Sequence, residues 1–129
     1  MIVDASALLA ILFGEPEAED FSSAIGSASA RAISAVNYVE AGIRVDRTGS
    51  TRHANALDEI IDAFRLDIAS VTSEQGILAR QAYRFFGKGH HPAGLNLGDC
   101  FAYALAKTRA EPLLFKGNDF IHTDIEPAL

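Results

Sequence analysis

The segment IVDASAL, residues Ile2–Leu8, places two apolar β-branched residues directly before an acid. Ile2 and Val3 suit a short buried strand, and Asp4 stands where that strand ends. Ser6 can cap a helix that follows and runs through Phe13. The segment therefore predicts a strand–helix unit with a carboxyl group at the carboxyl end of its strand.

Strands and helices alternate along the rest of the chain. The expected strands are Ala30–Ile33, Leu66–Val71, Pro112–Lys116 and a last short strand near the C-terminal end. Two helices are expected to begin at Pro16 and after the cap Ser34. A third carries the apolar stripe of Leu57, Ile60, Ile61 and Phe64. A fourth begins at the capping box of Thr72 and Gln75, and a fifth begins at Asn96 or Leu97. Helices follow strands often two at a time, which predicts an α/β fold, a three-layer α/β/α sandwich around a central, mainly parallel sheet.

Composition restricts the classes of function. A chain of 129 residues, 49% of them hydrophobic, predicts a single domain over residues 1–129 with a real core. The net charge of −6 argues against binding nucleic acid through overall positive charge, so a phosphate substrate needs a local basic patch or a bridging cation. With one cysteine, Cys100, no basic leader and no apolar membrane span, we expect a cytoplasmic protein without a membrane partner.

Four of the acids occupy positions that are unusual for surface residues. Asp4 ends the first strand, Glu40 lies among apolar residues of a helix, Asp99 lies in the first turn of a helix, and Asp119 follows the strand Pro112–Lys116. Because the carboxyl ends of parallel strands share one edge of a sheet, these acids are expected to meet there. Each acid alone also has a structural interpretation, such as a favourable helix dipole for Asp99 or a turn for Asp119.

Clustered carboxylates repel one another unless protons or cations neutralise them. Oxygen ligands in this number suit Mg²⁺ or Mn²⁺ and not Zn²⁺. Such ions can bind a phosphodiester, generate hydroxide from water and stabilise the leaving oxygen. The acidic cluster therefore predicts a metal-dependent nuclease.

Basic residues recur every four positions in one predicted helix and just beyond it. Arg80, Arg84 and Lys88 can line one face as a track for the RNA backbone, or they form an ordinary solvated face. Arg44 and Arg47 are a similar but weaker pair.

Four motifs resemble those of PIN-domain ribonucleases, and especially VapC-type toxins of type II (VapBC) toxin–antitoxin systems. They are IVDASAL at Ile2–Leu8, SAVNYVE at Ser34–Glu40, LNLGDC at Leu95–Cys100 and LLFKGNDF at Leu113–Phe120. They cover almost the whole chain in the family's order, and the third and fourth together are specific. The resemblance implies a PIN-like fold.

The resemblance also implies roles for particular residues and partners. The metal-binding and catalytic pocket is formed by Asp4, Glu40, Asp99 and Asp119, of which Asp119 is the least consistent ligand in such proteins. Ser6 orders the pocket by hydrogen bonding, and Asn118 has a supporting role. The implied activity is Mg²⁺-dependent cleavage of RNA, with Mn²⁺ as a substitute, by a homodimer that a cognate VapB-type antitoxin inhibits.

Other functions compete with this interpretation. A phosphatase of the haloacid-dehalogenase type needs a second acid two residues after Asp4, where this chain has Ser6. A receiver-like signalling domain needs an aspartate after its middle strand, where this chain has Val71-Thr72-Ser73. A PIN-like nuclease that is not a toxin and an inactive, nucleic-acid-binding PIN-like module remain as alternatives, although the retention of all four acids argues against inactivity.

Overall fold

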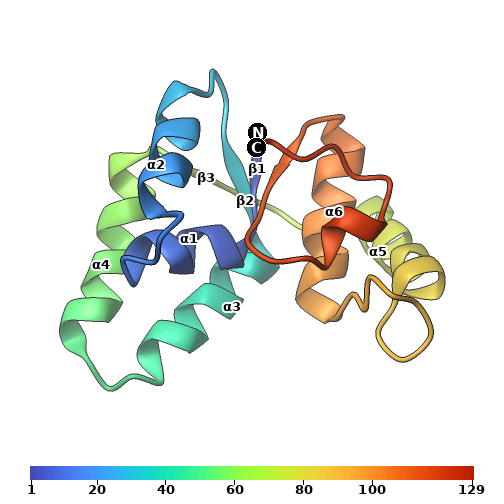
Figure 1. The fold of residues 1–129 in the computed structure, drawn as a ribbon, viewed down its shortest axis with the longest axis horizontal. Coiled ribbons are helices and arrows are strands. Elements are labelled where there is room, and N and C mark those ends of the chain that lie inside the picture. The colour runs from blue at the N-terminus through green and yellow to red at the C-terminus, as the bar shows by residue number, and fades with distance from the viewer.

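A central parallel sheet with helices on both faces forms the protein, as Figure 1 shows. The computed structural model describes residues 1–129. Its strands are β1 (Ile2–Val3), β2 (Ala32–Ser34), β3 (Asp67–Ala69) and β4 (Leu113–Leu114). Its helices are α1 (Ala5–Leu12), α2 (Ala18–Ser27), α3 (Ala35–Asp46), α4 (Thr51–Ala63), α5 (Ser73–Phe86), α6 (Leu97–Arg109) and the short 3₁₀ helix η1 (Phe120–His122). None of these helices is both long enough and apolar enough to cross a membrane.

The four strands lie in the order β3-β2-β1-β4, and all neighbouring pairs are parallel. Ile2 of β1 is in register with Ala32 of β2 on one side and with Leu113 of β4 on the other. All strands therefore end at the same edge of the sheet. Asp4 follows β1 at this edge, α3 begins there after β2, and the segment with Asp119 leaves from there after β4.

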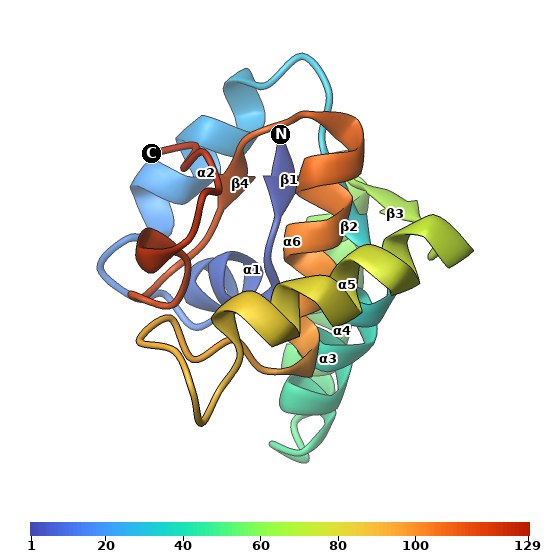
Figure 2. The same cartoon turned by 90° about the vertical axis from the view of Figure 1, so that its right-hand side faces the viewer.

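Successive residues of the strands belong to two different hydrophobic cores. Ile2 and Leu113 pack in the core under α5 and α6, whereas Val3 and Leu114 pack in the core under α1, α2, α3 and α4. Figure 2 shows α5 and α6 stacked over one face of the sheet. Alternation between two apolar faces is what a strand covered on both sides requires, and the predicted three-layer sandwich is confirmed.

Local capping explains most of the helix starts. Ser34 Oγ accepts from Val36 N at 3.2 Å, and Thr72 Oγ1 accepts from Gln75 N at 3.1 Å, as the sequence predicts. The predicted cap of the first helix is wrong, because Asp4 occupies that position and Ser6 lies inside α1. A carboxylate at the helix start accepts from the free backbone N–H groups at least as well as a hydroxyl.

The strands are shorter than predicted, and the expected C-terminal strand is absent. Only an isolated bridge joins Pro127 to Leu113, and the helix η1 stands before it. After Leu114 the chain turns away from the sheet, since Lys116 N donates to Ser6 Oγ at 3.0 Å and not to a neighbouring strand.

Candidate active site

One open cavity of about 430 Å³ at the carboxyl edge of the sheet is lined by all four predicted acids. Asp4, Glu40, Asp99 and Asp119 reach it from four separate segments of the chain. The sheet thus brings together residues that are separated by up to 115 positions in the sequence, from Asp4 to Asp119.

Asp4 is buried, and its two carboxyl oxygens have different environments. Oδ2 accepts from Ser6 N at 3.0 Å and from Ser6 Oγ at 2.5 Å, which fixes the carboxyl group. Oδ1 is buried without any hydrogen-bond partner. Burial raises the pKa of Asp4, the Asp119 charge adds to the rise, and the Ser6 hydrogen bonds oppose it. A buried oxygen without a partner calls for a proton or a cation.

Asp99 is held by a complete capping box at the start of α6. Its Oδ2 accepts from Asn96 N at 3.0 Å, while Asn96 Oδ1 accepts from Asp99 N at 2.9 Å. Burial raises the pKa of Asp99 to about 7, and the charges of Asp4, Asp119 and Glu40 add to this effect against the opposing Asn96 hydrogen bond. Asp99 is therefore partly protonated at neutral pH.

Glu40 is positioned by two residues that the sequence analysis missed. Asn37 is fully buried, and its Nδ2 donates to Gly98 O at 2.9 Å and to Glu40 Oε1 at 3.3 Å. A Cβ atom at Gly98 would lie 2.6 Å from Glu40 Cδ and 2.8 Å from Oε1, so the carboxyl group occupies the space of the missing side chain. Burial raises the pKa of Glu40, and the Asp4 charge contributes further. A glycine in the first turn of a helix was the only sequence signal for this close approach.

Asp119 is the most accessible of the four acids. It precedes η1 and is exposed, as is its neighbour Asn118, which does not line the cavity. The buried ring of Phe120 anchors the segment just after Asp119.

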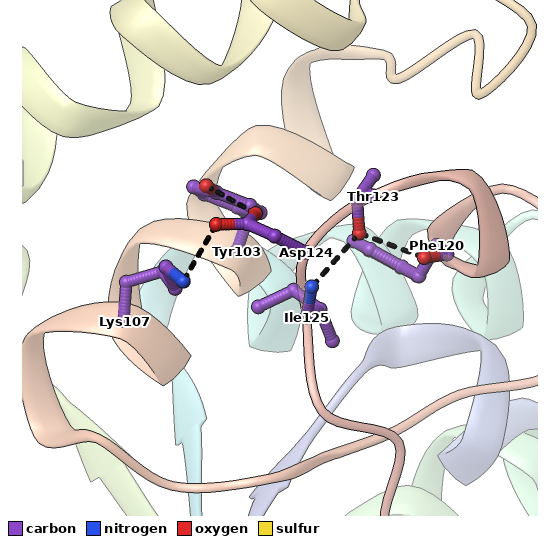
Figure 3. A network of polar contacts seen from close by, with 6 residues as sticks. All are labelled: Tyr103, Lys107, Phe120, Thr123, Asp124 and Ile125. Carbon is purple, nitrogen blue, oxygen red and sulfur yellow. Dashed lines mark hydrogen bonds and ion pairs between the residues drawn. The ribbon is translucent and has the colours of Figure 1, made fainter.

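A polar network fastens the chain beyond η1 to α6, as Figure 3 shows. Asp124 accepts from Tyr103 Oη at 2.7 Å and from Lys107 Nζ at 2.8 Å. These bonds lower the pKa of Asp124, with the Lys107 hydrogen bond as the largest cause. Thr123 Oγ1 closes the turn by donating to Phe120 O at 2.7 Å. Asp119 thus lies on a segment that is held at both ends, by β4 and by this network.

The predicted basic track does not enter the acidic cavity. Arg80 lines a separate apolar groove between α5 and α6, while Arg84 and Lys88 are exposed. Instead, Arg44 of α3 and Arg47, the residue that caps its C-terminal end, line the cavity with the acids.

The oxygen donors that line this cavity suit a metal ion, although the side chains are not yet arranged around one. No three His, Cys, Asp or Glu side chains of the protein are arranged so that they could already hold an ion. The donors are nevertheless carboxylates alone, one oxygen of Asp4 is buried without a partner, and the pKa values of Asp4, Glu40 and Asp99 are raised. Hard oxygen donors with unneutralised charge suit Mg²⁺ or Mn²⁺, which would draw the side chains together.

Comparison with known proteins identifies the family. Residues 1–126 match the PIN domain family. Ribonuclease VapC28 of Mycobacterium tuberculosis is 49% identical over 130 aligned positions, which cover 100% of this chain and 98% of that protein.

Two solved structures share the fold. VapC20 of M. tuberculosis, described as a toxin that cleaves the sarcin–ricin loop, superposes with a TM-score of 0.74 at 17% identity, over 96% of this chain and 95% of its own. A chain of a toxin–antitoxin complex from Klebsiella pneumoniae superposes with a TM-score of 0.72 at 16% identity, over 95% of this chain and 92% of its own. With a family match over nearly its whole length and a relative of this similarity, the chain belongs to the PIN-domain family and, within it, to the VapC type.

Proposed function

We propose that the protein is a Mg²⁺-dependent ribonuclease toxin, with Mn²⁺ as a possible substitute, and that its site comprises Asp4, Glu40, Asp99 and Asp119. The observation that carries this proposal is the convergence of the four acids on one cavity in which Asp4 Oδ1 is buried without a partner. The name of the relative VapC28, a ribonuclease aligned over the whole chain, supports the choice of RNA as substrate.

Asp4 and Asp99 are the principal ligands in this proposal, and Glu40 and Asp119 complete the set. When bound, the metal supplies positive charge that attracts the phosphodiester and lowers the pKa of water. The protein's own residues set the donors in place. Ser6 and Asn96 each fix one oxygen of an aspartate and leave the other without a hydrogen bond, while Asn37 orients Glu40. Asn118 is exposed beside Asp119, and its supporting role stays a prediction.

Metal removal and one substitution test the proposal. Cleavage of RNA should stop in excess EDTA and return with Mg²⁺ or Mn²⁺. Asp4→Asn should lower the cleavage rate by at least about a hundredfold, because it removes a main electrostatic contributor to the transition state. A mock preparation from cells that do not express the protein, purified in parallel, controls for contaminating nuclease. Full cleavage in chelator, or by Asp4→Asn, would contradict the mechanism.

A cognate VapB-type antitoxin is the proposed regulatory partner. Val39 and Ile43 of α3 are each 54% exposed, and Leu97 at the start of α6 is 73% exposed. Together with Glu40 they line a notch next to the acidic cavity. An amphipathic segment can cover these apolar residues and place an Arg or Lys among the carboxylates. Phe85, which is 72% exposed while Phe86 packs against the core, offers a second apolar contact.

Expression in bacteria tests the toxin role. The wild-type chain alone should arrest growth, and co-expression of a small antitoxin-type gene found next to its own should relieve the arrest. Asp4→Asn should be harmless alone and still bind that partner through the apolar contacts. A wild-type chain that is harmless at high expression and co-purifies with no neighbour would leave a PIN-type nuclease without a toxin role. In this proposal residues 1–129 form a single PIN domain that acts in the cytoplasm as a homodimer.

A further inference from the structure

Two arginines, Arg44 of α3 and Arg47 directly after its last residue, share the cavity with the four acids and remain unpaired. Arg44 and Arg47 line the cavity, yet neither makes an ion pair with a carboxylate. Lys116, by contrast, pairs with Glu15 and Glu17. The charges of the two arginines are therefore available for an anionic ligand.

Their spacing places them in line with an acid of the site. Glu40 and Arg44 are four positions apart on α3, and the C-cap Arg47, three positions further, keeps a helical backbone, so the three residues lie along one face. At a rise of about 1.5 Å per residue, the backbones of Glu40 and Arg47 are roughly 10 Å apart along the helix axis. A single-stranded RNA that lies along α3 would therefore pass from the acids to the arginines.

Arg44 is held in position by an aromatic ring. Its guanidinium carbon lies 5.2 Å from the ring centroid of Phe13, and the Phe13 ring packs edge-on against His53 at 5.2 Å. Arg44 makes no ion pair and no side-chain hydrogen bond in this position, so its guanidinium N–H groups remain free to donate to two phosphate oxygens. The rotamer entropy that binding would otherwise cost is thereby reduced.

We propose that Arg44 and Arg47 bind a backbone phosphate of the RNA next to the bond that is cut, and so hold the strand along α3. This inference rests on the proposed ribonuclease function and names a substrate contact of the same site. A protein with a net charge of −6 and an acidic cavity repels RNA, so it needs local cations at the rim of the cavity. The predicted track of Arg80, Arg84 and Lys88 does not line this cavity.

Binding of RNA by variants that cannot cut it tests the inference. The parent protein is Asp4→Asn, and the probe is a short fluorescein-labelled single-stranded RNA of mixed sequence, measured by anisotropy with Mg²⁺ over a range of salt. Arg44→Gln and Arg47→Gln should each weaken binding roughly tenfold, as expected for a lost charge-assisted hydrogen bond. Each should also lower the slope of log K against log salt by about 0.7.

Matched substitutions elsewhere serve as controls. Arg65→Gln removes an exposed arginine that precedes β3, at the opposite edge of the sheet. It should change neither the affinity for RNA nor the salt dependence of binding. Arg44→Lys keeps the charge and loses the planar fork, so its binding should fall between the parent and Arg44→Gln. In the cleaving wild-type background, Arg44→Gln and Arg47→Gln should raise KM and leave kcat within about threefold.

The outcomes separate this inference from the proposed function. If the wild type does not cleave RNA, the proposed function fails. If it cleaves and the Arg44 and Arg47 variants bind with the parent's affinity and salt slope, only the arginine assignment fails. A loss confined to a triple variant of Arg80, Arg84 and Lys88 would also overturn the assignment, as would salt-independent binding by all variants.

Discussion

Replacement of Asp99 by asparagine should change how the metal-free protein responds to pH. The folded state raises the pKa of Asp99 from 3.8 to about 7, mainly by burial. Between these values folded Asp99 binds a proton that the unfolded chain lacks, so the free energy of unfolding falls as pH rises through this window and levels off above it. Asparagine carries no charge at any pH and removes this contribution, while its side-chain oxygen can still accept from Asn96 N.

The size of the effect follows from the pKa shift. A rise from 3.8 to about 7 corresponds to about 4 kcal/mol at most, at roughly 1.4 kcal/mol per pKa unit. The cavity is open to water, and screening halves this to about 2 kcal/mol. For a chain of this length, about 4 °C per kcal/mol predicts that Asp99→Asn melts about 8 °C above the wild type on the alkaline side of the window. Below the window the two proteins should differ little.

Thermal unfolding in EDTA, followed by circular dichroism from about pH 4 to about pH 8, measures the difference directly. Asp4 and Glu40 also have raised pKa values, so both proteins should lose some stability with rising pH, and only their difference reports on Asp99. Saturating Mg²⁺ should raise the wild-type Tm more at the higher pH, because protons compete with the metal for the carboxylates. If the Tm of Asp99→Asn and that of the wild type differed by the same amount at every pH, burial would not be what raises the pKa of Asp99.

Three further changes test the surroundings of the site. Gly98→Ala should lower cleavage at least about tenfold, because its Cβ displaces the Glu40 carboxyl group and a misplaced catalytic group is costly. Gly26→Ala, at a helical glycine with open space around it, is the matched control and should keep full activity with a Tm that is unchanged or higher. Tyr103→Phe removes the hydrogen bond to Asp124 and should cost about 1 kcal/mol in urea unfolding, and an unchanged midpoint would show that the network does not fasten the C-terminal segment.

Residues that carry a local signal could be predicted from the sequence. The caps Ser34 and Thr72 and the acids at strand ends depend on neighbours within a few positions, and the structure places them as expected. The contacts of Asn37 could not be predicted, because its partner Gly98 is distant in the sequence and is defined only by how α3 packs against α6. The place of the arginine pair could not be predicted for the same reason, since helical spacing shows that Arg44 and Arg47 share a face but not which cavity that face lines.

Strand lengths depend on tertiary structure in a similar way. The apolar run Leu66–Val71 predicts a long strand, but only Asp67–Ala69 pairs with β2, since β3 lies at the edge of the sheet and has no second neighbour. The cap at Asp4 shows a different limit. Serine and aspartate are both good caps, and the backbone geometry of the β1–α1 junction selects the aspartate.

The position of β1 between β2 and β4 has a consequence for the synthesis of the protein. Ile2 pairs with Leu113, so β1 leaves the ribosome before β2, β3 and β4 and gains its second neighbour only once β4 has followed. Asp119 follows that last strand, and Asp99 lies on the helix that leads into it. Two of the four acids that line the cavity are therefore synthesised after β1, β2 and β3, and they join Asp4 and Glu40 only when α6 and the segment after β4 are in place. In the proposed nuclease, a chain still being synthesised would therefore lack a complete acidic site while it lies beside the RNA that encodes and translates it.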